Sequence, residues 1–374
     1  MKATLKVRLM PNKEQEKKFI EFANAARFVY NYSLGLKVSE YTTNGISLSL
    51  ADLLREVRLF KYSNEWLLQV PEAIQKQAIK DMLTAFSQYY KRGCKGFPKF
   101  KKKGKTKLSF YQRTDNLRRV DSRHIKLTGI KKPVKVNKDM GVINYQNSRV
   151  IYDSKYWYLT FSYDVAEQNL PDLKGVIGVD LGVRKLATTS DGVVYNNINN
   201  TKSILVLEER RKRLQRKLSK KYYKNKQGNK FVKTNNIVKL EQQIRLINRK
   251  LKNIRETYIH TITNELVKAK PNTIVIEDLD VSEMLKNRYL SKSIKECCFY
   301  KFRVFLDYKC RFYGINLVIA DRYYASSKTC SSCGYINRYL GSSELYVCPN
   351  CGKVMDRDIN AAINLRNYGL SLIA

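Results

Sequence analysis

Two pairs of cysteines near the end of the chain constrain its fold more than any other feature. Cys330 and Cys333 form one Cys-x-x-Cys pair, and Cys348 and Cys351 form a second pair after fourteen intervening residues. Because tetrahedral Zn²⁺ takes four soft ligands and each such turn presents two thiolates, the spacing predicts a zinc ribbon over residues 328–355. Four thiolates leave no open coordination position, so we expect one structural Zn²⁺ ion. The alternative of four unrelated surface cysteines leaves the paired spacing unexplained.

The charge of the chain predicts a polyanionic partner. Its 374 residues include 71 Lys and Arg against 33 Asp and Glu, which gives a net charge of +38. A compact fold with this excess repels itself unless a polyanion is bound, and nucleic acid is the expected polyanion. The alternative is a membrane-surface or solubilising charge, but no lipidation motif or basic amphipathic anchor stands out.

No part of the sequence suggests a membrane or an oxidising compartment. The N-terminus has no apolar leader, and no uncharged apolar stretch reaches transmembrane length. The cysteines outside the two pairs are scattered, and two of them are adjacent. We therefore expect no membrane partner and a reducing, cytoplasmic location.

The first 170 residues combine strand and helix patterns. Alternating apolar residues predict a strand within 1–10, and Asn12 with Gln15 forms a capping box that opens a helical stretch. Residues 72–90 read as a further helix, and residues 156–163 as the clearest strand. We predict a small β-barrel from 1–10 and 107–170, with a helical module over 11–106 inserted in it.

A basic loop and a basic helix are the expected contacts with nucleic acid. Residues 82–114 contain no acid, and their lysines interleave with aromatic residues, which suits phosphate contacts beside base stacking. The alternative is a solvated basic linker. Residues 203–225 form a strongly basic helical pattern. The candidate contact residues are Lys99, Lys101, Lys102, Lys103, Arg210, Arg211, Arg213 and Lys217.

Residues 171–374 show an α/β pattern with acids at the ends of apolar segments. Asp180 ends an apolar strand, Glu277 ends another, and Asp358 opens the last predicted helix as its N-cap. A helix over about 294–313 and a strand over 316–320 precede the ribbon. Because a buried carboxylate without a partner costs several kcal/mol, such acids usually face a cation. Carboxylates suit Mg²⁺, which prefers oxygen ligands.

Each acid also has a structural interpretation. Asp180 could make a strand-end turn, and Asp278 and Asp280 compete with Glu277, although strand alternation places Glu277 on the opposite face from Ile276. Asp358 could be only a helix cap, with Asp356 as the true ligand. The sequence leaves the choice between these two aspartates open.

The order of the acids resembles the RNase H-like nuclease fold of the RuvC type. There, three side chains converge on two Mg²⁺ ions, one activating the attacking water and the other stabilising the leaving 3′ oxygen. The whole chain resembles the TnpB family of transposon-encoded RNA-guided DNA nucleases, related to miniature type V CRISPR effectors. The matching segments are residues 5–15, 26–31, 96–101, 178–182, 276–279, 326–334 and 356–362.

The resemblance implies a wedge β-barrel with an inserted helical recognition module, followed by a RuvC-like nuclease domain over 171–374 that contains the zinc ribbon. It implies a guide RNA and a double-stranded DNA target with a flanking motif as partners, and a prokaryotic, nucleoid-associated setting. By motif, Asp180, Glu277 and Asp358 are the catalytic acids that hold two Mg²⁺ ions. Ala325 departs from the proline that the family often has there. The oligomeric state stays open.

Two other functions compete with nuclease action. A nuclease-inactive RNA-guided DNA-binding repressor would lack catalytic acids, whereas all three motif acids are present. An accessory role in transposition is compatible with the sequence. Direct transposase chemistry is disfavoured, because His124 and His260 lie far apart and the glutamate is the middle acid.

Overall fold

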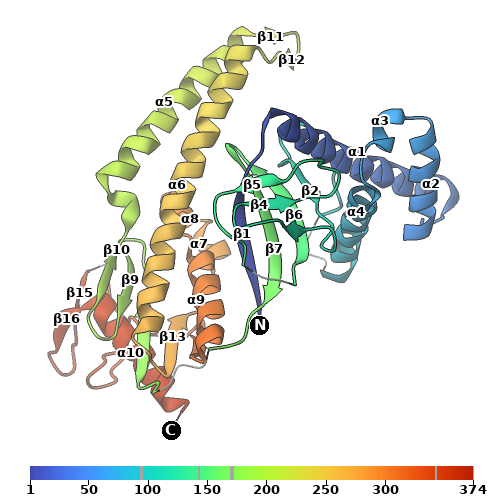
Figure 1. Cartoon of the computed structure of the whole chain (residues 1–374). Coiled ribbons are helices and arrows are strands. Elements are labelled where there is room, and N and C mark those ends of the chain that lie inside the picture. The colour runs from blue at the N-terminus through green and yellow to red at the C-terminus, as the bar shows by residue number, and fades with distance from the viewer. Residues whose placement is uncertain (93–95, 142–143, 169–171, 342, 374) are drawn as a thin grey trace. The chain divides into compact units, whose positions relative to one another are not determined.

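The computed structural model of the chain describes residues 1–92, 96–141, 144–168, 172–341 and 343–373 (Figure 1). They form two compact units, Met1–Val165 and Ala166–Ala374, each built around its own sheet. The domain boundary predicted at 170–171 lies outside the described residues, as do three residues of the basic loop, 93–95.

The first unit contains a seven-stranded antiparallel sheet with β1 (Lys2–Met10) near its middle. β1 pairs with β7 (Tyr156–Asp164) on one side and with β5 (Val134–Val136) on the other, and the strand order is β2-β6-β7-β1-β5-β4-β3. Both segments are strands, as the alternation patterns predicted, and the structure pairs the first residues of the chain with its residues near 160. The other strands are β2 (Ser109–Tyr111), β3 (Arg118–Arg119), β4 (His124–Lys126) and β6 (Gln146–Asp153).

Helices and an aromatic cluster complete the first unit. The predicted capping box of Asn12 and Gln15 is confirmed, and α1 begins directly after Asn12. Phe19 lies 5.2 Å from Trp157 of β7 and 5.7 Å from Phe110 of β2 between ring centroids, which fixes α1 on the sheet. The helices are α1 (Lys13–Asn44), α2 (Leu50–Tyr62), α3 (Glu65–Leu68) and α4 (Glu72–Arg92).

The second unit contains a five-stranded mixed sheet of order β10-β9-β8-β13-β14. β8, β13 and β14 are parallel, whereas β9 and β10 continue as an antiparallel meander. The parallel strands are apolar runs, as expected for strands covered on both faces. The strands are β8 (Val176–Asp180), β9 (Lys185–Thr189), β10 (Val194–Asn196), β13 (Thr273–Glu277) and β14 (Asn316–Ala320).

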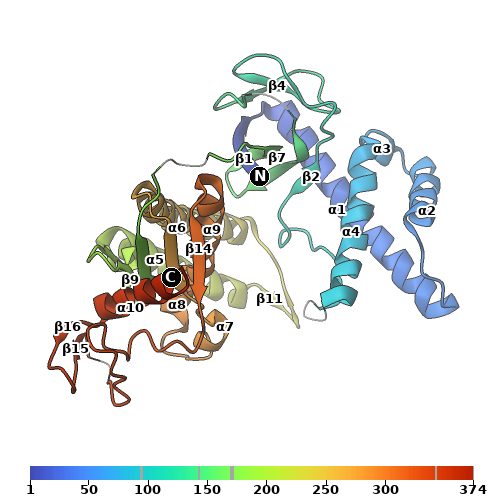
Figure 2. The same ribbon diagram turned by 90° about the horizontal axis from the view of Figure 1, so that it is seen from below.

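Different helices cover the two faces of this sheet. Val179 and Ile276 pack with α6 (Asn235–Lys268) and α9 (Phe299–Tyr313) on one face. Val275 packs with Leu365 of α10 (Arg357–Ser371) on the other face, where α10 contacts β8, β13, β9 and β14 (Figure 2). Successive strand residues thus point to opposite helices, and Glu277 follows Val275 toward α10.

The helices between β10 and β14 include a long hairpin. α5 (Lys202–Lys224) and α6 run side by side, and the small pair β11 (Lys226–Gln227) and β12 (Lys230–Phe231) closes the hairpin tip (Figure 1). The single helix predicted over 294–313 is wrong, because Cys298 adopts a left-handed conformation, φ 57°, between two helices. The remaining short elements are η1 (Ile198–Asn200), α7 (Val281–Met284) and α8 (Ser291–Cys297).

None of the helices in the described part of the chain combines the length and apolar character needed to cross a membrane.

Glycines let α10 lie directly against the sheet. A Cβ on Gly178 of β8 would lie 2.0 Å from the backbone oxygen of Ala362 and 2.5 Å from the backbone nitrogen of Arg366. On α10 itself, a Cβ on Gly369 would lie 2.5 Å from a methyl group of Val275. Backbone atoms cannot yield as flexible side chains do, so Gly178 sets the distance between α10 and β8.

We predict that Gly178→Ala destabilises the second unit by about 2–3 kcal/mol or more, because the added methyl group forces helix and strand apart. Differential scanning calorimetry measures the change as a lower transition temperature. Gly341→Ala is the matched control, since no atom lies within 4 Å of a Cβ placed there. Equal stability of the two variants would contradict the close-packing argument.

Candidate functional site

Asp180 ends β8 in a position that water hardly reaches. Asp180 is 9% exposed. In the antiparallel ladder between β8 and β9, Asp180 lies opposite Thr188. Directly opposed residues of such a ladder project their side chains to the same face. The hydroxyl of Thr188 is buried and has no hydrogen-bond partner among the described residues. A buried carboxyl therefore stands beside an unsatisfied buried hydroxyl.

Glu277 ends the neighbouring parallel strand at the same level. Ile276 of β13 pairs with Val179 of β8, so the next residues, Glu277 and Asp180, end adjacent strands at one edge of the sheet. The hydroxyl of Ser326 donates a hydrogen bond to Glu277 Oε1. The register thus brings together two acids that are far apart in the sequence.

Asp358 enters from α10. It lies in the first turn of this helix, and its charge acts on Asp180. Because α10 packs on the face toward which Asp180 and Glu277 point, all three predicted acids meet at one edge of the five-stranded sheet.

Asp356, not Asp358, caps the helix, which corrects the sequence prediction. Asp356 Oδ1 accepts hydrogen bonds from the backbone nitrogens of Asp358 at 2.9 Å and Ile359 at 3.2 Å. Its other oxygen lies 2.5 Å from Lys185 Nζ. Burial would raise the pKa of Asp356, but Lys185 and the helix amides outweigh it and lower the pKa. Both oxygens of Asp356 are thus engaged within the protein, whereas Asp358 contacts Lys185 only at 3.4 Å.

The two buried carboxyl groups, those of Asp180 and Glu277, do not tolerate full ionisation without a cation. Burial, followed by the charges of Glu277 and Asp358, raises the pKa of Asp180 well above its ordinary value. Burial also raises the pKa of Glu277, although hydrogen bonds from Ser326 and Asp180 oppose the shift. A proton or a positive ion must therefore compensate this cluster at neutral pH.

The oxygen atoms of the three acids lie too far apart for all of them to bind one metal ion. Among the described residues, only the four ribbon cysteines place three or more candidate ligand atoms within 4.8 Å of one another. Two-metal sites hold their ions about 3.5–4 Å apart, so their ligands need not all lie within reach of one ion. Oxygen ligands, an orphaned hydroxyl and excess negative charge at Asp180 fit hard divalent cations.

The four cysteines gather at a separate position in the second unit. The Sγ atoms of Cys330 and Cys351 lie 3.7 Å apart, and those of Cys333 and Cys348 lie 3.6 Å apart. Each knuckle closes through a glycine with positive φ, Gly334 and Gly352, whose nitrogens donate to Cys330 O and Cys348 O. The strands β15 (Leu345–Val347) and β16 (Val354–Asp356) flank the second knuckle and lead into α10. These sulfurs could hold one tetrahedral metal ion.

Known proteins resemble the chain along nearly all of its length. Three family models match it: a helix-turn-helix domain, HTH_OrfB_IS605, over 1–45, the "Probable transposase" model OrfB_IS605 over 160–288, and the Cas12f1-like TNB domain over 299–365. A Streptomyces pristinaespiralis protein named as a candidate RNA-guided DNA endonuclease is 26% identical over 100% of this chain and 91% of its own. The TnpB-like protein L79 of Acanthamoeba polyphaga mimivirus is 31% identical over 53% of this chain and 38% of its own.

Together, these matches support a TnpB identity for the chain. Its fold is similar to a solved structure, the Cas12f1–sgRNA–target DNA complex, with a TM-score of 0.61 and 18% identity over 95% of this chain and 83% of the other. The mixed α/β architecture is therefore shared with this type of effector.

The predicted basic loop partly buries one of its four candidate lysines and exposes the other three. Lys101 Nζ lies 3.6 Å from the centre of the Tyr30 ring, and burial lowers the pKa of Lys101. Asn31 fixes the same residue by bonding both its backbone nitrogen, at 2.8 Å, and its oxygen, at 3.0 Å. Lys99, Lys102 and Lys103 are exposed. These three are thus free to meet a phosphate backbone, and Lys101 serves to anchor the loop.

The basic helix α5 shows the same division. Arg211 pairs with the buried Glu208, which Arg255 of α6 also contacts at 3.3 Å. Arg210, Arg213 and Lys217 are exposed along the hairpin. Arg211 therefore joins α5 to the body of the unit, while its neighbours face solvent.

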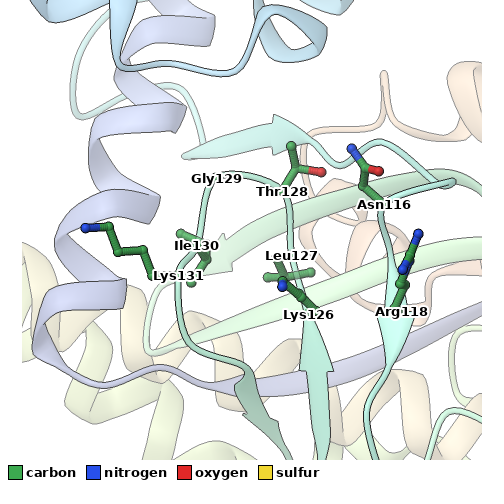
Figure 3. A pocket seen from close by; sticks show the side chains of 8 residues that line it. All are labelled: Asn116, Arg118, Lys126, Leu127, Thr128, Gly129, Ile130 and Lys131. Carbon is green, nitrogen blue, oxygen red and sulfur yellow. The ribbon is translucent and has the colours of Figure 1, made fainter.

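A basic hollow in the first unit was not predicted from the sequence. Its volume is about 460 Å³, and Arg118, Lys126 and Lys131 line it together with the backbone turn at Gly129 (Figure 3). These residues come from separate short strands and loops, so no local sequence signal marks them.

Sequence analysis also did not identify Lys185, Thr188 and Ser326 as part of the acid site. Lys185 lies five residues after Asp180, and Ser326 lies within a segment that matches the family. Their contacts depend on strand pairing and on the loop path after β14, which no spacing rule specifies.

We predict that the second unit loses stability as pH rises in buffer without divalent cations. The pKa of Asp180 is higher in the folded protein than its ordinary value of 3.8, which applies to the unfolded chain. Above pH 3.8 the folded protein therefore holds a proton that the unfolded chain has lost. The unfolding free energy falls as pH rises from 3.8 through the raised pKa. One proton contributes a slope of up to about 1.4 kcal/mol per pH unit. Urea denaturation at a series of pH values measures it.

Asp180→Asn should flatten this decline, and added Mg²⁺ should reduce it in the unmodified protein because a cation replaces the proton. An identical slope in the two proteins would exclude Asp180 as its source.

Proposed function

We propose that this protein is an RNA-guided DNA endonuclease, which hydrolyses phosphodiesters with two Mg²⁺ ions held by Asp180, Glu277 and Asp358. The observation that carries the proposal is the meeting of three carboxyl groups from distant segments at one sheet edge, where burial and mutual repulsion raise the pKa of Asp180. A purely structural role gives no reason for burying Asp180 and Glu277 side by side, with no ion pair to either among the described residues, in a chain of net charge +38.

The topology of the second unit supports a RuvC-like, RNase H-like assignment. An antiparallel meander is followed by parallel strands β13 and β14, with an acid at the carboxyl end of β8 and of β13. We assign residues 171–374 to this nuclease domain, 1–10 and 107–170 to a wedge barrel, and 11–106 to a helical recognition module. The ribbon over 328–355 interrupts the nuclease domain.

The acids would divide the work of holding the ions. Mg²⁺ supplies activation of a water nucleophile and stabilisation of charge on the leaving oxygen when it is bound. The charges of both other acids act on Asp180 and raise its pKa, so Asp180 is the acid in which bound cations would offset the most repulsion. Glu277 and Asp358 would supply the remaining carboxylate oxygens, and the Lys185 ammonium, 3.4 Å from Asp358, would add positive charge that could attract a phosphate.

The four cysteines would hold one structural Zn²⁺ ion. Cys330 and Cys348 are each 1% exposed, and Tyr346, fully buried, packs with them. A closed four-thiolate site leaves no coordination position for substrate.

We infer that guide RNA and double-stranded target DNA with a flanking motif are the partners. A relative is named for RNA-guided DNA cleavage, and the solved complex with the similar fold contains a guide RNA and target DNA. In such systems base pairing reads the sequence, and the protein grips backbone and flanking duplex. The exposed lysines of the basic loop and the exposed basic residues of α5 suit that grip.

We predict different outcomes for the two aspartates before α10. Asp358→Ala should lower cleavage of guide-matched DNA in Mg²⁺ by about a thousandfold, equivalent to about 4 kcal/mol. Asp356→Ala should lower stability by about 1 kcal/mol through loss of the helix cap and reduce cleavage by about tenfold or less. Protein purified with its own RNA, which is then sequenced to design the target, provides the assay.

Asp180→Ala is the accompanying control, since it should abolish cleavage while RNA binding persists. Failure of the unmodified protein to cut matched DNA would favour an RNA-guided binding protein instead. Loss of cleavage in Asp356→Ala but not in Asp358→Ala would reverse the assignment of the third acid.

We predict that Arg210→Gln, Arg213→Gln and Lys217→Gln together weaken nucleic-acid binding and flatten its salt dependence. Each lost phosphate contact reduces the slope of log K against log salt by about 0.9 for duplex and about 0.7 for single strands, so the triple variant should lose about 2–3 in slope. Binding titrations at several salt concentrations measure it.

Arg211→Gln is the matched control on the same helix. Because Arg211 is engaged with Glu208, its loss should lower stability and leave the salt slope nearly unchanged. An unchanged slope in the triple variant would remove α5 from the binding surface.

A further inference from the structure

Residues 325–331 link the four-cysteine cluster to the acid site. The segment begins shortly after β14 and ends inside the first Cys-x-x-Cys turn. Ser326 is 4% exposed, and its hydroxyl donates to Glu277 Oε1. One buried side chain of this segment therefore touches a proposed Mg²⁺ ligand, while Cys330 of the same segment belongs to the cysteine cluster.

Two buried asparagines of α10 hold this segment in place. Asn364 Nδ2 donates to the backbone oxygens of Ser326 at 2.7 Å and Thr329 at 2.6 Å. Asn360 Nδ2 donates to Thr329 O at 2.7 Å, and Asn360 Oδ1 accepts from the backbone nitrogen of Ser331 at 2.9 Å. The two asparagines are one turn apart and 0% and 3% exposed. They bind backbone atoms at both ends of the segment.

The same helix carries Asp358, two residues before Asn360. Glu277 and Asp358 come from different elements, and the chain of contacts from Asp358 through α10, Asn364 and Ser326 connects them within the protein. The cysteine turn restrains the far end of this chain, because Ser331 lies between Cys330 and Cys333.

We propose that Ser326 is a positioning residue for Glu277, held by Asn360 and Asn364 so that the ordered cysteine cluster sets the placement of Glu277 relative to Asp358. This inference rests on the proposed function, in which both acids hold Mg²⁺. Asn360 and Asn364 of α10 thus serve the acid site through the backbone of residues 326–331.

The test compares Ser326→Ala with Ser326→Thr, which keeps the hydroxyl, and with Ser327→Ala. The hydroxyl of the neighbouring Ser327 makes no hydrogen bond within the described part of the chain, so its loss is a matched control. Two readouts are taken on the full chain: the Mg²⁺ concentration that half-saturates cleavage, and Mg²⁺ binding by calorimetry without nucleic acid. Zinc content per chain is measured in parallel.

Loss of a partner that orients a metal ligand typically weakens the metal site by 10–100-fold. We expect about a tenfold higher half-saturating Mg²⁺ concentration for Ser326→Ala, unchanged zinc content, and recovery to within about threefold for Ser326→Thr. The proposal is overturned if Ser326→Ala and Ser327→Ala share one Mg²⁺ dependence. If the unmodified protein does not cleave, the proposed function fails, and calorimetry still decides whether Ser326 orders the acid site.

Asn360→Ala tests the link to the cysteine cluster. It should raise the half-saturating Mg²⁺ concentration in the same direction while zinc remains bound. Asn360→Ser keeps a hydrogen-bonding group and replaces the alanine variant if that variant does not fold. An unchanged Mg²⁺ dependence in the folded variant would overturn the role of Asn360.

Discussion

The backbone contact between α10 and β8 is the constraint on which the second unit depends. Gly178 lets Ala362 and Arg366 approach the strand at a distance that no other residue allows. α10 carries Asp358, Asn360 and Leu365. This one contact therefore positions an acid of the site, the asparagine that binds the backbone of Ser331, and a core side chain that packs on Val275. The edge of the sheet becomes a site only because the helix lies so close to it.

Electrostatics then decides what this edge can accept. Asp180 and Glu277 end adjacent strands, and their burial makes a shared negative charge costly. Lys185 offsets negative charge only at Asp356 and Asp358, which its ammonium group contacts. The inner carboxyl groups have no cationic side chain bonded to them among the described residues, so the site favours a proton or a hard cation.

Some basic side chains of the chain contact groups within the protein, and others are exposed to solvent. Lys101 and Arg211 lie near partners that the fold brings to them, an aromatic ring in one case and a buried carboxylate in the other. Their neighbours in the sequence point to solvent because a helix or loop turns successive residues in different directions. Composition therefore predicts the type of partner, while local geometry selects the residues that can meet it.

Sequence by itself determined the elements whose signal is local. The capping box at Asn12, the strand over Val176–Asp180 and the paired cysteines each depend on neighbouring residues, and all three were found where the patterns predicted them. The sequence did not identify Asp356 as the helix cap or Cys298 as the break between two helices. Asp356 and Asp358 are equally suitable caps by residue type, and the left-handed backbone of Cys298 has no sequence signal, so only the backbone torsions decide both cases. Tertiary structure alone decided that Ser326 meets Glu277 and that Lys185 meets Asp358, since such contacts join segments that only sheet register and helix packing bring together.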